Sequence, residues 1–408
     1  MHIWYVLLIL LVTARIFGEL SKRIGIPALA GEILSGVLLG LAFGYFPDFT
    51  PNVTHLHDNE VFTAITDLGI FFLMLYAGVE LSYNSLKKAT GKAVWVAIGG
   101  MILPLFLGIG LGWFSFPDSE MKSAQVFFLG VALAITAVPV AIKVLMDTGK
   151  LQSKAGQTIV SAAVIDDVVS LLLLAVLTYF LKNQEMPDLG GILLLTGKIA
   201  LFFLITVVVG LFALPYLIRI VTRKFNIAES EVSFLLVVAL SFSVLAEALD
   251  MHFILGAFIA GLFFTKREMK KSVYEDVKNK MGAITLGFLA PIFFASIGLS
   301  LDLSAFIHVP LFVLLLIVIA SVGKIAGAGF PARLAGMSNR DSMVIGNAMN
   351  ARGAVELIIA DIALRAGLFN TPADSPMIQN LFSAVVIMAI VTTLVTPVVL
   401  KKIVSWKK

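Results

Sequence analysis

Two adjacent aspartates, Asp166 and Asp167, lie in the segment AAVIDDVVSLLLLAV, which is otherwise almost wholly apolar. A charged side chain at the centre of a membrane helix costs about 2.5–3.5 kcal/mol on insertion scales, and such groups usually mark ion or proton pathways. We therefore expect Asp166 and Asp167 to form an ion- or proton-binding site. The alternative is that the two carboxylates only form hydrogen bonds with adjacent helices.

Three more charged residues lie within apolar segments. Lys324 occurs in IASVGKIAGAGF, and Arg352 and Glu356 occur in NAMNARGAVELIIA. Because a buried lysine needs a counter-charge, we expect Lys324 to pair with one of the aspartates, Asp166 in particular. That bridge is either structural or opens during function. Arg352 and Glu356 are four residues apart and can simply pair along one helix.

Two of the apolar segments also contain residues that break helices. Pro139, in ALAITAVPVAIKVL, lacks a backbone N–H and clashes with the preceding turn. Asn350 and Gly353 flank Arg352 in the second segment and are weak helix formers. Interrupted helices at matching positions of two halves of a transporter indicate a site at mid-membrane depth. Pro139 alone would indicate an ordinary kink.

The composition predicts that these segments cross a membrane. Of the 408 residues, 59% are hydrophobic and only 14% are charged, against about 25% charged in soluble domains. The apolar runs are long and continuous, unlike the roughly 10-residue alternating strands of a membrane β-barrel. The absence of cysteine excludes disulfides and thiolate metal sites, and the net charge of +4 calls for no nucleic acid partner. We expect an all-α polytopic membrane protein.

The apolar segments give about thirteen membrane-spanning helices. Segment 252–265 is short for a bilayer of roughly 30 Å, and the first segment is expected to be a span rather than a removable signal peptide. The expected spans are 4–20, 29–46, 61–79, 93–116, 123–145, 155–181, 190–221, 232–249, 252–265, 281–299, 307–333, 341–364 and 378–400.

The basic residues predict the orientation of these spans. Alternate connecting segments and the C-terminal tail hold 22 of the 30 Lys and Arg residues, whereas the intervening segments hold 3. The basic side of a membrane protein is cytoplasmic, so we expect the N-terminus outside and the C-terminus inside a prokaryotic cell membrane. Spans 1–6 and 8–13 then begin on opposite sides, which is the parity of an inverted six-helix repeat.

Six segments in order resemble a known family: LGIFFLMLYAGVEL, ITAVPVAIKVL, SAAVIDDVVSLLLLAV, GAFIAGLFF, PIFFASIGLSLDL and MNARGAVELIIA. Together they resemble the monovalent cation/proton antiporters, specifically the CPA2 branch with the NapA-like Na⁺/H⁺ exchangers and the Kef-type transporters. The double aspartate resembles the electrogenic Na⁺/H⁺ members. The Kef systems carry a C-terminal regulatory domain, which we expect to be absent here because the chain ends eight residues after the last expected span.

The resemblance implies a homodimer with two crossed discontinuous helices in inverted repeats. Within a single transporter domain, 1–408, it implies dimerisation helices at about 1–46 and 190–265 and a mobile ion-binding core at about 61–181 and 281–400.

The resemblance also implies roles for individual residues. Asp167 matches the ion-binding carboxylate, and Asp166 matches the partner that pairs with Lys324. Thr136 and Ala137 match the helix crossover that adds oxygen ligands for Na⁺. Some relatives have RGE where this chain has Arg-Gly-Ala at 352–354, which leaves the roles of Arg352 and Glu356 open.

The implied function is exchange of Na⁺, or Li⁺, for H⁺ by alternating access, electrogenic, without a cofactor and without enzymatic activity. A carboxylate in a low-dielectric site is costly to ionise and readily takes a proton, whereas a bound cation stabilises its ionised form. The two ions therefore compete for Asp167. A K⁺/H⁺ antiporter of the same fold is the nearest alternative, since selectivity is not readable from the sequence. An intramembrane aspartyl protease is remote, because no G-x-G-D sequence occurs; a channel-like permease is the third alternative.

Overall fold

The computed structural model describes most of the chain as α-helices joined by short connections. The described residues are 3–45, 59–81, 91–136, 150–183, 189–224, 229–264 and 271–405, with positions 141, 144, 145 and 148, and they include no strand. Two residues that the sequence singled out, Ala137 and Pro139, lie outside the described residues.

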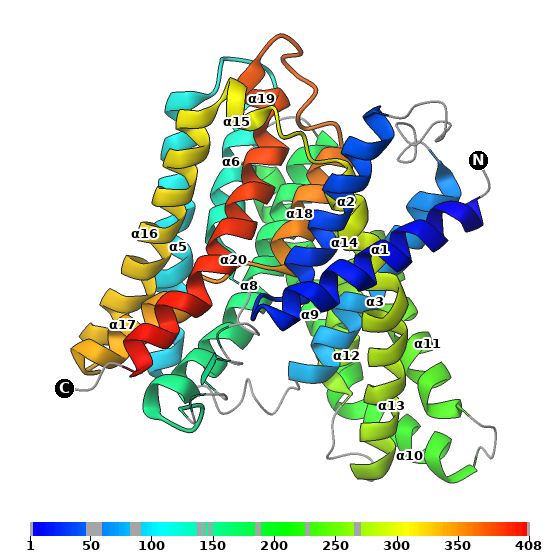
Figure 1. Ribbon diagram of the computed structural model, residues 1–408. Coiled ribbons are helices and arrows are strands. Elements are labelled where there is room, and N and C mark those ends of the chain that lie inside the picture. The colour runs from blue at the N-terminus through cyan, green and yellow to red at the C-terminus, as the bar shows by residue number, and fades with distance from the viewer. Residues whose placement is uncertain are drawn as a thin grey trace. The chain divides into compact units, whose positions relative to one another are not determined.

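Figure 1 shows the helices in order. They are α1 (Ile3–Arg23), α2 (Ala28–Tyr45), α3 (Glu60–Leu81), α5 (Gly91–Ser115), α6 (Lys122–Ala134), α8 (Lys154–Asn183), α9 (Leu189–Val208), η3 (Val209–Ala213), α10 (Leu214–Lys224), α11 (Ser230–Ala248), α12 (Phe253–Phe263), α13 (Lys271–Ile284), η4 (Thr285–Leu289), α14 (Ala290–Leu299), α15 (Ala305–His308), α16 (Pro310–Leu334), α17 (Asn339–Ala348), α18 (Ala354–Arg365), α19 (Pro376–Gln379) and α20 (Leu381–Ser405).

Among the described residues, nine helical segments are long and apolar enough to cross a membrane, and three shorter helices are apolar. Twelve of the thirteen segments expected from the sequence overlap one of these helices, and the remaining segment, 341–364, overlaps the two helices α17 and α18. The all-α membrane fold is therefore confirmed. The number of crossings and the inverted repeat remain predictions.

The chain forms two compact units. Unit 1 comprises residues 1–20, 31–87 and 187–299, and unit 2 comprises 21–30, 88–186 and 300–408. Unit 2 contains most of the range expected for the ion-binding core, although 61–87 and 281–299 belong to unit 1. Which unit moves and which dimerises remains a prediction.

Glycines allow the helices of unit 2 to pack with their backbones in contact. A Cβ at Gly108 of α5 would lie 2.7 Å from the Cα of Gly130 in α6. A Cβ at Gly327 of α16 would lie 2.6 Å from the carbonyl oxygen of Gly99 in α5. Close approach through small residues is the usual basis of helix association in membranes, and here it holds α5 against both neighbours.

One connecting segment differs from the sequence-based expectation. The basic segment that precedes residue 281 was expected to be a loop, but α13 already begins at Lys271. Its buried residues Tyr274, Val277 and Met281 follow the spacing of an amphipathic helix. The Tyr274 hydroxyl donates a hydrogen bond to the Val79 carbonyl at 2.7 Å. The lysines and acidic residues of α13 lower its mean hydropathy, so a search for long apolar stretches does not find this helix.

Candidate functional site

Two helices of unit 2 are interrupted, and the candidate site is built at these breaks. Helix α6 ends at Ala134, and Ile135 is extended with φ −76° and ψ 149°. Helix α17 ends at Ala348, and α18 begins only at Ala354. The end of α6 exposes carbonyl groups and the start of α18 exposes N–H groups, because neither set has partners within its own helix. The helix thus ends just before Ile135, and Pro139, to which the sequence assigned a break, lies outside the described residues.

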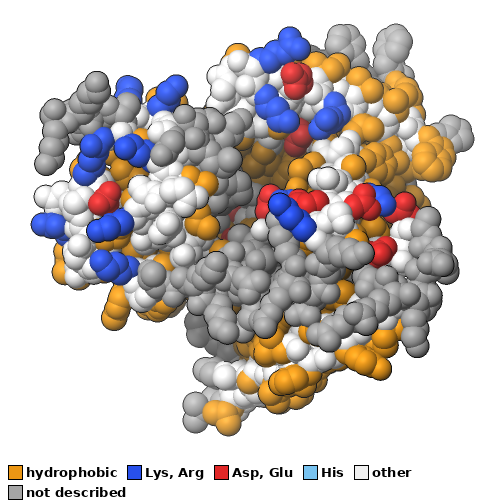
Figure 2. All heavy atoms as spheres, turned by 90° about the horizontal axis from the view of Figure 1, so that it is seen from below, with side chains coloured by type: hydrophobic (Ala, Val, Ile, Leu, Met, Phe, Trp, Pro, Cys, Tyr) orange, Lys and Arg blue, Asp and Glu red, His pale blue; other side chains and the backbone are white. Residues whose placement is uncertain are grey.

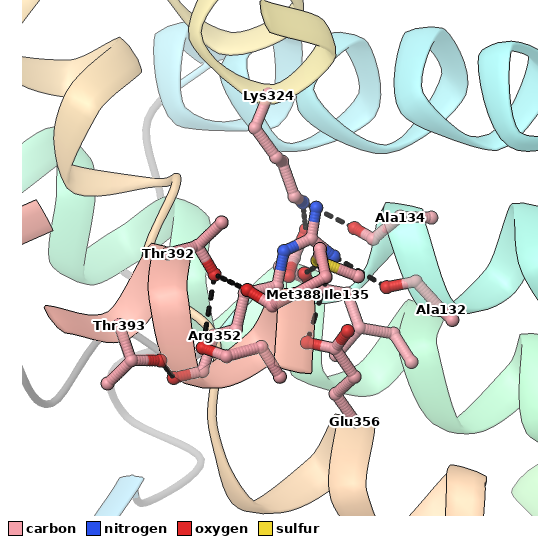
Figure 3. Close-up of polar contacts among 11 residues, drawn as sticks. Ala132, Ala134, Ile135, Lys324, Arg352, Glu356, Met388, Thr392 and Thr393 are labelled. Atoms are coloured by element: carbon pink, nitrogen blue, oxygen red, sulfur yellow. Dashed lines mark hydrogen bonds and ion pairs between the residues drawn. The ribbon is translucent and has the colours of Figure 1, made fainter. Parts of the chain in front are cut away.

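Arg352 connects the two breaks. It lies between α17 and α18, is fully buried, and donates from Nη1 to the carbonyl oxygens of Ala132 at 2.5 Å and Ile135 at 3.1 Å (Figure 3). A cation at the C-terminal end of a helix is stabilised by the helix dipole. The carbonyl of Arg352 in turn accepts a hydrogen bond from the Thr393 hydroxyl of α20 at 2.6 Å. Arg352 therefore fixes the end of α6 to α20.

Lys324 of α16 is a second cation at the end of α6. Its Nζ donates to the carbonyl of Ala134 (Figure 3). The same Nζ lies 3.4 Å from Oδ1 of Asp166. Both charged side chains of this pair are fully buried, with 0% exposure. The structure therefore brings together Lys324 and the aspartate that the sequence assigned to it.

Glu356 lies in the first turn of α18, where the helix dipole favours a carboxylate. Its Oε2 is 3.8 Å from Nη1 of Arg352. Neither oxygen of Glu356 accepts a hydrogen bond within the described part of the chain, and Nε and Nη2 of Arg352 also have no acceptor there. The two residues pair, as their spacing suggested, but Arg352 lies in the break before α18 rather than on the same helix, and the pair rests on charge attraction rather than a hydrogen bond.

Three buried oxygens near the breaks have no hydrogen bond of normal geometry among the described residues: Oδ2 of Asp166, the hydroxyl of Thr136 and Oδ1 of Asn350. Thr136 lies in the non-helical segment after α6, beside the Asp166 carboxylate. An unsatisfied buried polar atom costs about 1–3 kcal/mol. A bound cation would remove that cost, because carboxylate, hydroxyl and amide oxygens are ligands of hard cations.

Asp167 is only partly buried and follows Asp166 on α8. Successive helical residues point about 100° apart, so the two carboxylates face different surroundings. Asp167 nevertheless interacts electrostatically with Asp166 and Lys324. Among the described residues, Asp166 has Lys324 as an ion-pair partner and Asp167 has none.

The charges of this cluster favour one monovalent cation. Lys324 interacts electrostatically with Asp166, Arg352 and Glu356, and Asp167 interacts with Lys324. Three carboxylates and two cations leave one net negative charge when every group is ionised. A single proton or a single alkali cation therefore neutralises the cluster.

Comparisons with known proteins place the chain in one family. Residues 6–406 match the family model described as sodium/hydrogen exchanger, transmembrane. The chain is 32% identical to the Na⁺/H⁺-K⁺ antiporter GerN of Bacillus cereus, over 96% of this chain and 94% of GerN. It is 30% identical to a Na⁺/H⁺ antiporter of Enterococcus hirae, over 97% of this chain and 96% of that protein.

A solved structure shares the fold. The sodium proton antiporter MjNhaP1 from Methanocaldococcus jannaschii, at pH 8, superposes with a TM-score of 0.70 at 19% identity. The match covers 98% of this chain and 95% of that chain. The helical architecture expected from the sequence is thus that of a known antiporter structure.

Proposed function

Because this chain belongs to the sodium/hydrogen exchanger family, we propose that it is a secondary antiporter that exchanges Na⁺ for H⁺ by alternating access. The observation that carries the proposal is the buried cluster at the two helix breaks, where Oδ2 of Asp166 and the Thr136 hydroxyl have no hydrogen bond of normal geometry among the described residues. The exchange supports pH homeostasis. It requires no cofactor, and the protein is a transporter rather than an enzyme.

Asp167 is the group for which Na⁺ and H⁺ compete. Its carboxylate is the less buried of the two and has no ion-pair partner among the described residues, whereas Asp166 is already engaged by Lys324. Desolvation makes the ionised carboxylate costly, so either a proton or a cation must stabilise it. Na⁺ would take oxygen ligands from Asp167, from Oδ2 of Asp166 and from Thr136. Competition at one alternately exposed site yields exchange without a separate coupling device.

The choice of cation is tested in proteoliposomes that contain a pH-sensitive dye, with NaCl, LiCl and KCl added in turn. We expect proton movement with Na⁺ and Li⁺ and a weaker response to K⁺. GerN is named for K⁺ as well as Na⁺, so K⁺ is the second cation to examine. A response to K⁺ as strong as that to Na⁺ would identify a K⁺/H⁺ antiporter. Na⁺ flux that ignores the proton gradient would identify a channel-like permease.

Lys324 determines whether transport moves net charge. Exchange of one proton for one Na⁺ is electroneutral, so electrogenic exchange needs a second titrating group. Lys324 is the candidate, because the Asp166 carboxylate must release Lys324 before that carboxylate can bind Na⁺ fully. We expect Lys324→Gln to retain Na⁺/H⁺ exchange but to lose the accompanying current on a solid-supported membrane. Lys154→Gln, at the exposed start of α8, is the control. An unchanged current per Na⁺ would remove Lys324 from the transport cycle.

We propose that the basic face of unit 2 is cytoplasmic. Figure 2 shows Lys and Arg side chains gathered at its left, where α16 ends and α17 begins. Exposed residues there include Arg333 and Arg340. This distribution agrees with the positive-inside rule and with an outside N-terminus and an inside C-terminus in the cell membrane. From the family resemblance we also propose a homodimer. Accessibility of single cysteines introduced into this cysteine-free chain tests the orientation.

A further inference from the structure

Helices α5 and α16 form an apolar groove of about 810 Å³. Its floor is the contact between Gly99 and Gly327, where the absence of side chains lets the two backbones meet. Its walls are apolar side chains on either side of that contact. The wall residues that matter here are Trp95, Ile98, Ile102, Ala326, Phe330 and Leu334.

The groove faces outward from unit 2. Trp95 and Phe330 are each 65% exposed, and Leu334 is 72% exposed. Lys324, two residues before Ala326 on the same helix, is fully buried. Residues two apart on a helix point in nearly opposite directions, so the groove is separate from the ion-binding cluster.

The two helices run antiparallel, which places two cations at one end of the groove. Gly99 contacts Pro331, whereas Pro104 contacts Gly323. The beginning of α5 therefore lies beside the end of α16. Lys92 is one turn before Trp95, and Arg333 adjoins Leu334; both basic side chains are exposed. The wall segments, 91–103 and 326–335, contain no Asp or Glu.

We propose that this groove binds an acyl chain of an anionic phospholipid, whose phosphate lies between Lys92 and Arg333. The apolar walls match a hydrocarbon chain, and the volume falls within the roughly 300–1,000 Å³ of small-molecule sites. Tryptophan is favoured at the membrane–water interface, where Trp95 would meet the glycerol region. Basic residues next to a membrane attract anionic lipids, so the two cations select the headgroup while the groove holds the chain.

The test uses the full-length protein in detergent and native mass spectrometry. Phosphatidylglycerol and phosphatidylcholine with identical acyl chains are titrated separately. We expect phosphatidylglycerol to bind more tightly. Each of Lys92→Gln and Arg333→Gln should weaken its binding about fivefold, and the double variant about 25-fold. The control Lys154→Gln should bind as the wild type does.

A second pair of variants tests the groove itself. Ala326→Phe fills the groove from an exposed position and should reduce binding of both lipids, whereas Val318→Phe, exposed on the same helix outside the groove, should not. Arg333 also donates to the Met337 carbonyl at 2.9 Å, so Arg333→Gln removes a contact within the protein as well as a cation. Thermal unfolding of Arg333→Gln and Lys92→Gln is therefore compared, to separate an effect on stability from an effect on lipid binding. Equal affinity for the two lipids, or full binding by Ala326→Phe, would overturn the proposal. A changed dimer fraction in Ala326→Phe with unchanged lipid binding would assign the groove to contact between two copies of this chain.

Discussion

Replacing Asp167 by asparagine is expected to reduce Na⁺-driven proton exchange to the level of protein-free liposomes. The amide cannot release a proton at any relevant pH and offers Na⁺ no negative charge. Asp167 has no ion-pair partner among the described residues, so its substitution leaves no buried cation uncompensated and the fold should persist. The measurement is Na⁺-dependent dye dequenching in proteoliposomes, with size-exclusion chromatography as the check on folding.

Asp118→Asn is the matched control for this substitution. Asp118 lies between α5 and α6, and its Oδ1 is 2.6 Å from Nζ of Lys122. Hydrogen bonding and charge attraction from Lys122 lower the pKa of Asp118. Its carboxylate therefore stays ionised and has no part in proton exchange. Asp118→Asn should retain wild-type exchange, and exchange by Asp167→Asn at a similar rate would refute the assignment of Asp167.

Replacing Arg352 by leucine is expected to destabilise the protein by about 3–5 kcal/mol, the usual cost of removing one partner of a buried ion pair. Glu356, 1% exposed, would lose its cation. The carbonyls of Ala132 and Ile135 would lose their donor, so the end of α6 would lose its contact with the second break. Unfolding in mixed detergent micelles, followed by circular dichroism, measures the free energy lost.

A double-mutant cycle separates these contributions. Arg352→Leu combined with Glu356→Leu removes both buried charges, so the double variant should recover part of the stability lost in the single variant. Arg352→Lys keeps the charge but lacks the planar fork of donors. Its free energy of unfolding should lie between those of the wild type and Arg352→Leu, because one ammonium replaces the guanidinium that contacts two carbonyl groups. Strict additivity of the two leucine substitutions would mean that the ion pair contributes nothing.

The sequence predicted the transmembrane helices and the residues of the buried cluster because both follow from the cost of polar groups in lipid. Long apolar runs must form helices, since backbone groups in a bilayer need partners within the segment. A lysine within such a run needs a counter-charge, which pointed from Lys324 to Asp166. The structure brings those two residues within 3.4 Å.

The role of Arg352 was not predictable in the same way. Its partners are the backbone carbonyls of Ala132 and Ile135, more than 200 residues earlier. Every residue has a backbone carbonyl, so the residue types do not indicate which carbonyls accept from Arg352. Only the neighbouring Glu356 could be identified as a partner. Pro139, where local rules place the first break, lies outside the described residues. The end of α6 at Ala134 was not predictable either, because the donor to the Ala134 carbonyl is Lys324 of the distant helix α16.

The central claim is that one carboxylate site holds either a proton or Na⁺. Its most direct test is to add Na⁺ to the purified wild-type protein in weakly buffered detergent and to measure the protons released. We expect Na⁺ to displace protons and its apparent affinity to weaken by up to about tenfold for each unit of pH lowered, as linkage requires. Asp167→Asn should release none. Na⁺ binding with the same affinity at every pH, and without proton release, would contradict the account.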